Sequence, residues 1–83
     1  MRVAPSYPYT LKAEGVDGEV LVDFWVDEKG AVHDPVVRSS TRREFEEPTL
    51  VAVSKWRFAP GMKDGKTVRF RMTLPVRFSR ADL

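Results

Sequence analysis

Apolar and polar side chains alternate along two long stretches of the chain. The apolar members are Val20, Val22, Phe24 and Val26 in the first stretch and Val68, Phe70, Met72, Leu74, Val76 and Phe78 in the second. A period of two residues is typical of a strand that buries one face. Residues 31–39 are also rich in β-forming residues, and they follow a polar turn at 27–30 in which Gly30 is suited to positive φ. The pattern predicts three strands, of which the first two form a hairpin.

Proline and glycine mark where these strands are interrupted and where helices start and stop. Pro35 lies inside the second strand and has no N–H to donate, so that strand is expected to be an outer one or bulged at 33–35. A helix is predicted to begin near Glu47, with Pro48 in its first turn, and to be stopped by 59–61. Its apolar face would consist of Leu50, Val53 and Trp56. One or two further helical turns are expected at 9–14, closed by Gly15.

The order of these elements predicts an α+β fold. A helix that leaves the second strand and leads into the third crosses one face of the sheet, so the third strand should run parallel to the second with the first between them. The prediction is a three-stranded antiparallel or mixed sheet in the order 2-1-3, with the main helix and the short N-terminal helix on one face and water on the other. The third strand, from Thr67 to Phe78 after a polar turn at 63–66, then has a free edge.

Pro75 predicts which backbone groups face that edge. Residues of one parity direct their N–H and C=O groups to the same side of a strand, and proline is tolerated where that side has no partner. The residues that share its parity, and should therefore face the free edge, are Thr67, Arg69, Arg71 and Thr73. An added peptide strand, a homodimer seam, or an edge that stays single in the monomer are all compatible with this geometry.

Length, charge and composition exclude several classes of protein. Eighty-three residues with a net charge of +2 and no cysteine form one domain that is neither a disulfide scaffold nor a zinc ribbon. We divide it into an N-terminal segment at 1–17, a β-β-α-β core at 18–78 and a tail at 79–83. The longest apolar run, 50–53, is far shorter than the ~20 residues that span a bilayer.

The sequence offers little chemistry for an enzyme, a metal or a cofactor. It holds one histidine and no cysteine, and it has no glycine-rich phosphate loop. His33 beside Asp34 is a poor general base, because neighbouring strand residues point to opposite faces. We therefore expect no catalysis, no metal and no cofactor, with His33 exposed on an edge.

The third strand and its surroundings are unusually basic. The cations there are Lys66, Arg69, Arg71, Arg77 and Arg80. They fit a solvated face that prevents aggregation, or a small nucleic-acid platform, although Phe70 and Phe78 fall on the buried parity and are unable to stack on bases. Leu21 and Trp25 lie on the solvent parity of the first strand, where they form either a protein contact patch or a surface that Arg69 or Arg71 covers by cation–π stacking.

An ordered set of short motifs carries a family resemblance. It comprises Tyr7-Pro8, Gly18-Glu19-Val20-Leu21-Val22-Asp23-Phe24, Val26-Asp27, Gly30-Ala31-Val32, Ser39-Ser40, Phe45 and Trp56-Arg57-Phe58-Ala59-Pro60-Gly61. Together they resemble the C-terminal domain of TonB, the periplasmic energy transducer of Gram-negative bacteria, over 5–78. The resemblance implies an adaptor between an inner-membrane complex with ExbB and ExbD and TonB-dependent outer-membrane receptors, whose Ton box pairs with the last strand. It implies a periplasmic domain whose parent is anchored in the inner membrane by an N-terminal helix, and no nucleic-acid partner.

The same resemblance assigns roles to residues of this chain. The peptide-binding set is Thr67, Val68, Arg69, Phe70, Arg71, Met72, Thr73 and Leu74, and the receptor-contact set is Ser6, Tyr7 and Pro8. Tyr7 and Pro8 have an alternative role as anchors of the N-terminal segment. The structural core is expected to include Phe24, Trp56, Phe58, Phe70 and Phe78. Leu21 and Trp25 depart from the family, in which these positions are commonly polar.

Overall fold

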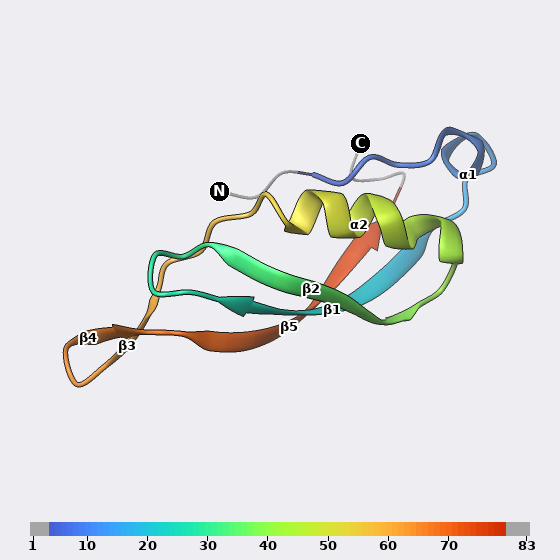
Figure 1. Cartoon of the computed structure of the whole chain (residues 1–83). Helices are drawn as coiled ribbons and strands as arrows, with labels where there is room; N and C mark the ends of the chain where they lie inside the picture. Colours follow the sequence, from blue (N-terminus) through green and yellow to red (C-terminus); the bar gives the residue numbers. More distant parts are fainter. Residues whose placement is uncertain (1–3, 80–83) are drawn as a thin grey trace.

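The computed structural model describes residues 4–79, and the fold is α+β (Figure 1). The helices are α1 (Tyr9–Ala13), the 3₁₀ turn η1 (Arg43–Phe45) and α2 (Glu46–Val53), and the strands are β1 (Gly18–Val26), β2 (Val32–Ser40), β3 (Gly61–Lys63), β4 (Lys66–Val68) and β5 (Phe70–Phe78). Residues 80–83 of the predicted tail at 79–83, and the first three residues of the N-terminal segment, lie outside the described residues. The main sheet has the order β2-β1-β5. Because β1 is antiparallel to both neighbours, β2 and β5 are parallel, which confirms the predicted topology.

The first hairpin and its outer strand confirm the turn prediction. Gly30 has φ of +84°, and the N–H of Asp27 donates to the carbonyl of Ala31 at 2.9 Å. β2 is an outer strand whose pairing with β1 shifts register twice, and Asp34 beside Pro35 has φ of +53°. The proline is therefore accommodated by an irregular outer strand.

The core lies between the sheet and α2. The even residues of β1, from Val20 to Val26, are at most 1% exposed, as their alternation predicts. Of the predicted core aromatics Phe24, Trp56 and Phe78 are buried, and Phe58 and Phe70 are partly buried against them. Phe45 is fully buried and stacks on Phe78 with ring centroids 4.4 Å apart.

α2 packs over β2 and β1, whereas α1 lies at the end of the sheet where β1 begins and places Leu11 in the core (Figure 1). Within residues 4–79, neither helix is both long and apolar enough to span a membrane.

The end of the main helix differs from the prediction. α2 stops at Val53, so Trp56 is not on its apolar face. The reason is tertiary: the N–H of Phe58 donates to the carbonyl of Gly30 at 2.9 Å, and Arg57 forms a β-bridge with Ala31. These bonds to the first hairpin require an extended chain after the helix, and they place the Phe58 ring against Phe24.

The prediction of one continuous strand from Thr67 to Phe78 is wrong. Residues 61–68 form a separate hairpin, in which Thr67 pairs with Met62 and Val68 pairs with Gly61. Asp64 and Gly65 both have positive φ, as two-residue hairpin turns require. The sequence signal that indicates this hairpin is the pair Asp64-Gly65, which β-forming residues follow, and the prediction did not use it. Arg69 separates β4 from β5.

Candidate functional site

Within residues 4–79, β5 is the last strand of the main sheet and its outer edge is free and regular. β5 pairs with β1 at nine consecutive positions, from Phe70 opposite Val26 to Phe78 opposite Gly18, without a register shift. The opposite edge belongs to β2, which is bulged. An incoming strand requires a regular row of backbone groups. β5 offers such a row from Phe70 to Leu74, before Pro75, and is therefore the edge suited to pairing.

The hydrogen bonds of β1 define which residues of β5 face outwards. On the β2 side, the carbonyl of Glu19 accepts a bond from the N–H of Thr41 at 3.0 Å, and the N–H of Asp27 donates to Ala31 at 2.9 Å. The backbone N–H and C=O groups of odd residues of β1 therefore point towards β2, and those of even residues point towards β5. Since odd residues of the two strands lie opposite each other, the backbone groups of Arg71, Thr73 and Arg77 are directed to the free edge, as is the position of Pro75.

A buried carboxylate organises the outer face of the sheet, the face opposite α2. Asp23 is 7% exposed, and its Oδ1 accepts a bond from the hydroxyl of Thr73 at 2.5 Å. Its Oδ2 lies 3.2 Å from Nη2 of Arg71 and 3.7 Å from Nε of Arg38. Sequence reasoning missed this cluster, because the bulge that brings Arg38 to Asp23 has no local sequence pattern.

Other arginines of the outer face also contact neighbouring side chains, while they stay exposed to solvent. Arg77 bonds Glu19 at 3.1 Å, and the guanidinium of Arg69 lies 4.7 Å from the ring centroid of Trp25. The cation–π alternative for Trp25 is thus confirmed. Because Arg69 covers this ring, Trp25 is poorly placed to stack on a nucleic-acid base.

The inner face of β5 changes in burial along the strand. Val76 and Phe78 are 6% and 3% exposed, whereas Phe70, Met72 and Leu74 are only half-buried. The cause is the position of α2, which packs over β2 and β1. An apolar strip at 70–74 therefore adjoins the free edge.

The structure brings most of the predicted peptide-binding residues to this edge. Those within β5 are Phe70, Arg71, Met72, Thr73 and Leu74. Arg69 comes directly before the strand, and Thr67 and Val68 lie in β4. The regular edge therefore begins at Phe70.

The predicted receptor contacts fall into an anchored and an exposed part. The hydroxyl of Tyr7 donates to the carbonyl of Val16, and its ring meets those of Phe45 and Phe78 edge-on at 5.7 and 5.5 Å. Pro8 precedes α1, and its carbonyl accepts a bond from Lys12 at 2.9 Å. Tyr7 and Pro8 thus fix the N-terminal segment on the fold.

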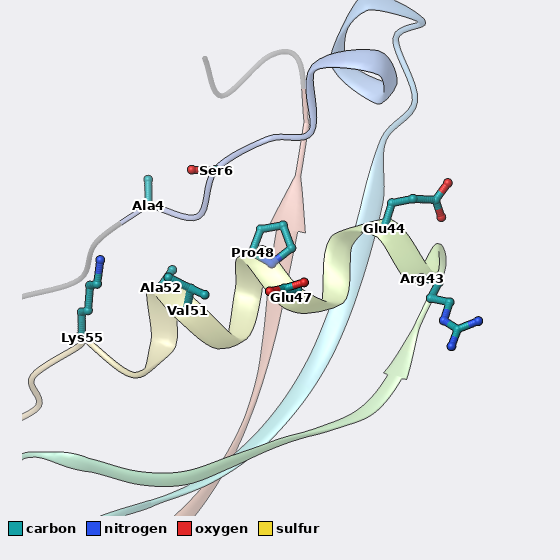
Figure 2. A pocket seen from close by; sticks show the side chains of 9 residues that line it. All are labelled: Ala4, Ser6, Arg43, Glu44, Glu47, Pro48, Val51, Ala52 and Lys55. Atoms are coloured by element: carbon teal, nitrogen blue, oxygen red, sulfur yellow. The ribbon is translucent and has the colours of Figure 1, made fainter.

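Ser6 is exposed beside a groove of about 460 Å³ between the N-terminal segment and α2 (Figure 2). Ala4, Pro48 and Val51 supply apolar lining, and the charged lining residues are Arg43, Glu44, Glu47 and Lys55. The pKa of Glu44 is lowered by its own backbone N–H and by Arg42. Sequence reasoning missed this groove, because its two sides are more than thirty residues apart.

His33 pairs with a different carboxylate from the one considered in the sequence. Its Nε2 lies 2.7 Å from Oδ2 of Asp27, while Oδ1 of Asp27 accepts bonds from the N–H groups of Lys29 and Ala31 at 2.9 Å. The bond to His33, followed by that to Ala31, lowers the pKa of Asp27 to about 2. His33 is exposed, as expected, and Asp27 serves the hairpin turn.

The lowered pKa predicts a loss of stability in acid. A carboxylate whose pKa is lower in the folded than in the unfolded chain stabilises the fold above its unfolded value, and this contribution disappears as the pH falls towards the folded value. Urea unfolding should show Asp27 contributing a fall in stability between about pH 4 and pH 2. The control is Asp27→Asn, whose amide oxygen still accepts the turn bonds but does not titrate. Identical pH slopes for the two proteins would contradict the assignment.

No group of three or more His, Asp or Glu side chains in the described range 4–79 is arranged to hold a metal ion.

The fold and the free edge define a small α+β domain that presents one regular strand for pairing. Residues 3–79 match the family described as Gram-negative bacterial TonB protein C-terminal, and the chain belongs to this family. The sequence is 31% identical over 78 residues to Protein TonB of Vibrio cholerae, covering 93% of this chain and 32% of that protein. It is 36% identical over 70 residues to Protein TonB of Pseudomonas aeruginosa, covering 83% of this chain and 20% of that protein. The chain thus spans about a third or less of these relatives.

Solved structures agree with this assignment. The solution NMR structure of the Pseudomonas aeruginosa TonB C-terminal domain matches with a TM-score of 0.79 at 32% identity, covering 95% of this chain and 81% of that one. A structure of the TonB2 protein of Vibrio anguillarum matches with a TM-score of 0.70 at 34% identity, covering 94% and 76%. The three-stranded sheet with its helix is therefore the TonB C-terminal fold.

Proposed function

We propose that this domain is a periplasmic adaptor that binds the Ton box of a TonB-dependent outer-membrane receptor by strand addition on β5. The parent protein would be anchored in the inner membrane and would transmit energy from ExbB and ExbD for uptake. Membership of the TonB C-terminal family supports this role.

The observation that carries the proposal is the free edge of β5. Nine residues lie in unbroken register on β1, and the backbone groups of Arg71 and Thr73 are directed outwards. A strand that pairs here forms several backbone hydrogen bonds at once, which suits a link that bears force along its length. Pro75 lacks an N–H, so the strongest pairing falls between Phe70 and Thr73.

The exposed Ser6 and the adjoining groove form the proposed second contact with the receptor. Tyr7 supports this contact indirectly, because its partly buried hydroxyl bond and its ring contacts hold the segment in place. The groove lies on the α2 side of the molecule. A receptor that contacts both regions would therefore hold the domain in one orientation.

The test is an amide-resolved NMR titration of the 15N-labelled domain with a synthetic Ton-box peptide and a scrambled control. We expect shifts along 70–74, and further shifts at Ser6 only when a receptor plug is added. Sedimentation velocity across a range of protein concentrations separates this from a homodimer that uses the same edge. The absence of shifts at millimolar peptide, in a folded monomer, would overturn the proposal.

A further inference from the structure

We propose that Arg71 selects the strand that β5 receives, by pairing with an acidic side chain of the peptide on the outer face. The peptide's other side chains, on the inner face, would be apolar and adjoin Met72 and Leu74. This inference rests on the strand addition proposed above, and it specifies the chemistry of the added strand.

The first argument is an excess of positive charge around Asp23. Two guanidinium groups, those of Arg38 and Arg71, share this one carboxylate, at 3.7 and 3.2 Å. The side chain of Asp23 is 9% exposed, whereas both arginine side chains are 60% exposed. The cluster of one acid and two bases thus carries a net charge of +1 at the surface.

The second argument is the position of Arg71 on the edge strand. Within residues 4–79, Arg71 donates to Asp23 through Nη2. Its guanidinium has five N–H donors, so those on Nε and Nη1 remain for a second carboxylate. In a sheet, a residue directly opposite another has its Cβ about 4.5–5.5 Å away on the same face. A peptide residue opposite Arg71 therefore lies within reach of its guanidinium. Arg38 is on β2, with β1 between it and this edge.

The neighbouring arginines are less suited to this role. Arg77 has Glu19 as its own partner at 3.1 Å, and Arg69 is stacked on Trp25 at 4.7 Å. Arg71 is thus the β5 arginine that shares its acid with another base. Two apolar, half-buried residues flank it on the inner face of the strand, Phe70 and Met72.

These features together define an amphipathic ligand. A peptide that shifts along β5 by two residues keeps the same side chains on each face of the sheet. The contact between its acid and Arg71 therefore favours one of these registers over the others. The site therefore recognises an extended peptide that alternates apolar residues with polar ones and carries an acid among the polar ones.

The experiment compares two synthetic peptides, acetyl-Val-Thr-Val-Asp-Val-Thr-Val-amide and its twin with Asn in place of Asp. Each is titrated by NMR into the wild type, Arg71→Gln and Arg38→Gln at about 0.15 M salt, where charges more than about 8 Å apart are largely screened. Both variants lose one positive charge and an ion pair with Asp23, so Arg38→Gln is the control for the charge of the cluster. The Nε–Hε resonance of Arg71 reports on the contact directly.

We expect the wild type to bind the Asp peptide about two- to fivefold more tightly than the Asn twin. Arg38→Gln should retain a smaller preference, because the guanidinium of Arg71 remains although the cluster loses its net positive charge. Arg71→Gln should bind the two peptides equally. Equal binding of the peptides to the wild type, or an undiminished preference in Arg71→Gln, would overturn the role of Arg71 while strand addition stands. If neither peptide shifts the β5 amides of the wild type, strand addition itself fails, and this inference fails with it.

Discussion

Gly30→Ala should lower the free energy of unfolding by about 3 kcal/mol or more. Gly30 has φ of +84°, a conformation that costs an L-residue about 1–2 kcal/mol. A Cβ at this position would lie 1.9 Å from the carbonyl oxygen of Phe58, which is backbone and has little room to move. Relieving that contact breaks the bond from the N–H of Phe58 to the carbonyl of Gly30, at a further cost of about 1–3 kcal/mol.

The matched control for this substitution is Gly65→Ala in the second hairpin. Gly65 has φ of +78°, but a Cβ there would meet nothing within 4 Å. It bears the conformational cost alone, and we expect a loss of about 1–2 kcal/mol. Chemical denaturation of both variants measures the difference. Equal losses would show that the contact between the first hairpin and Phe58 contributes little.

Arg71→Pro should weaken binding of a Ton-box peptide about tenfold or more. The N–H of Arg71 is directed to the free edge, so its removal leaves the ladder between β5 and β1 intact, as Pro75 already does at the same parity. The proline ring occupies the space of a peptide carbonyl and leaves that carbonyl without a donor, which costs about 1–3 kcal/mol. Calorimetric titration with the peptide measures the loss.

Arg71→Ala separates the backbone effect from the side chain. It removes the same contact with Asp23 but keeps the N–H, so it should lose only the few-fold affinity that the guanidinium supplies. An amide NMR spectrum shows whether each variant retains the fold. Comparable affinities for Arg71→Pro and Arg71→Ala, both folded, would argue that the peptide does not pair with β5.

Much of the candidate site was predictable from the sequence because it depends on local rules. Alternation placed Met72 and Leu74 on the inner face and Arg71 and Thr73 on the outer one. Pro75 indicated which parity faces the free edge, and the register of β5 on β1 gives the same parity. The inclusion of Thr67 and Val68 in the same strand was an error, because the alternation continues from β4 into β5 across the break at Arg69.

The family resemblance added what no periodicity contains. Trp56-Arg57-Phe58 was the most recognisable motif, and the structure shows its local role: the chain leaves α2 there and bonds the first hairpin through Phe58 and Gly30. The two ring pairs of Phe58, with Phe24 and Trp56, hold the motif against the core. Its function is therefore to support the fold that presents β5.

Alternation, turn residues and crossover handedness are properties of short segments. The sequence was therefore sufficient for β1 and β2, for the faces of β1 and β5, for the turn at Gly30 and for the order of the main sheet. The end of α2 and the partners of Asp23 are evident only in the folded molecule. Those features depend on bonds between residues far apart in the chain, and on a bulge that shifts Arg38 towards Asp23. A shift of one residue in register changes every charge pair on a face, so the chemistry of the free edge is set by the folded sheet.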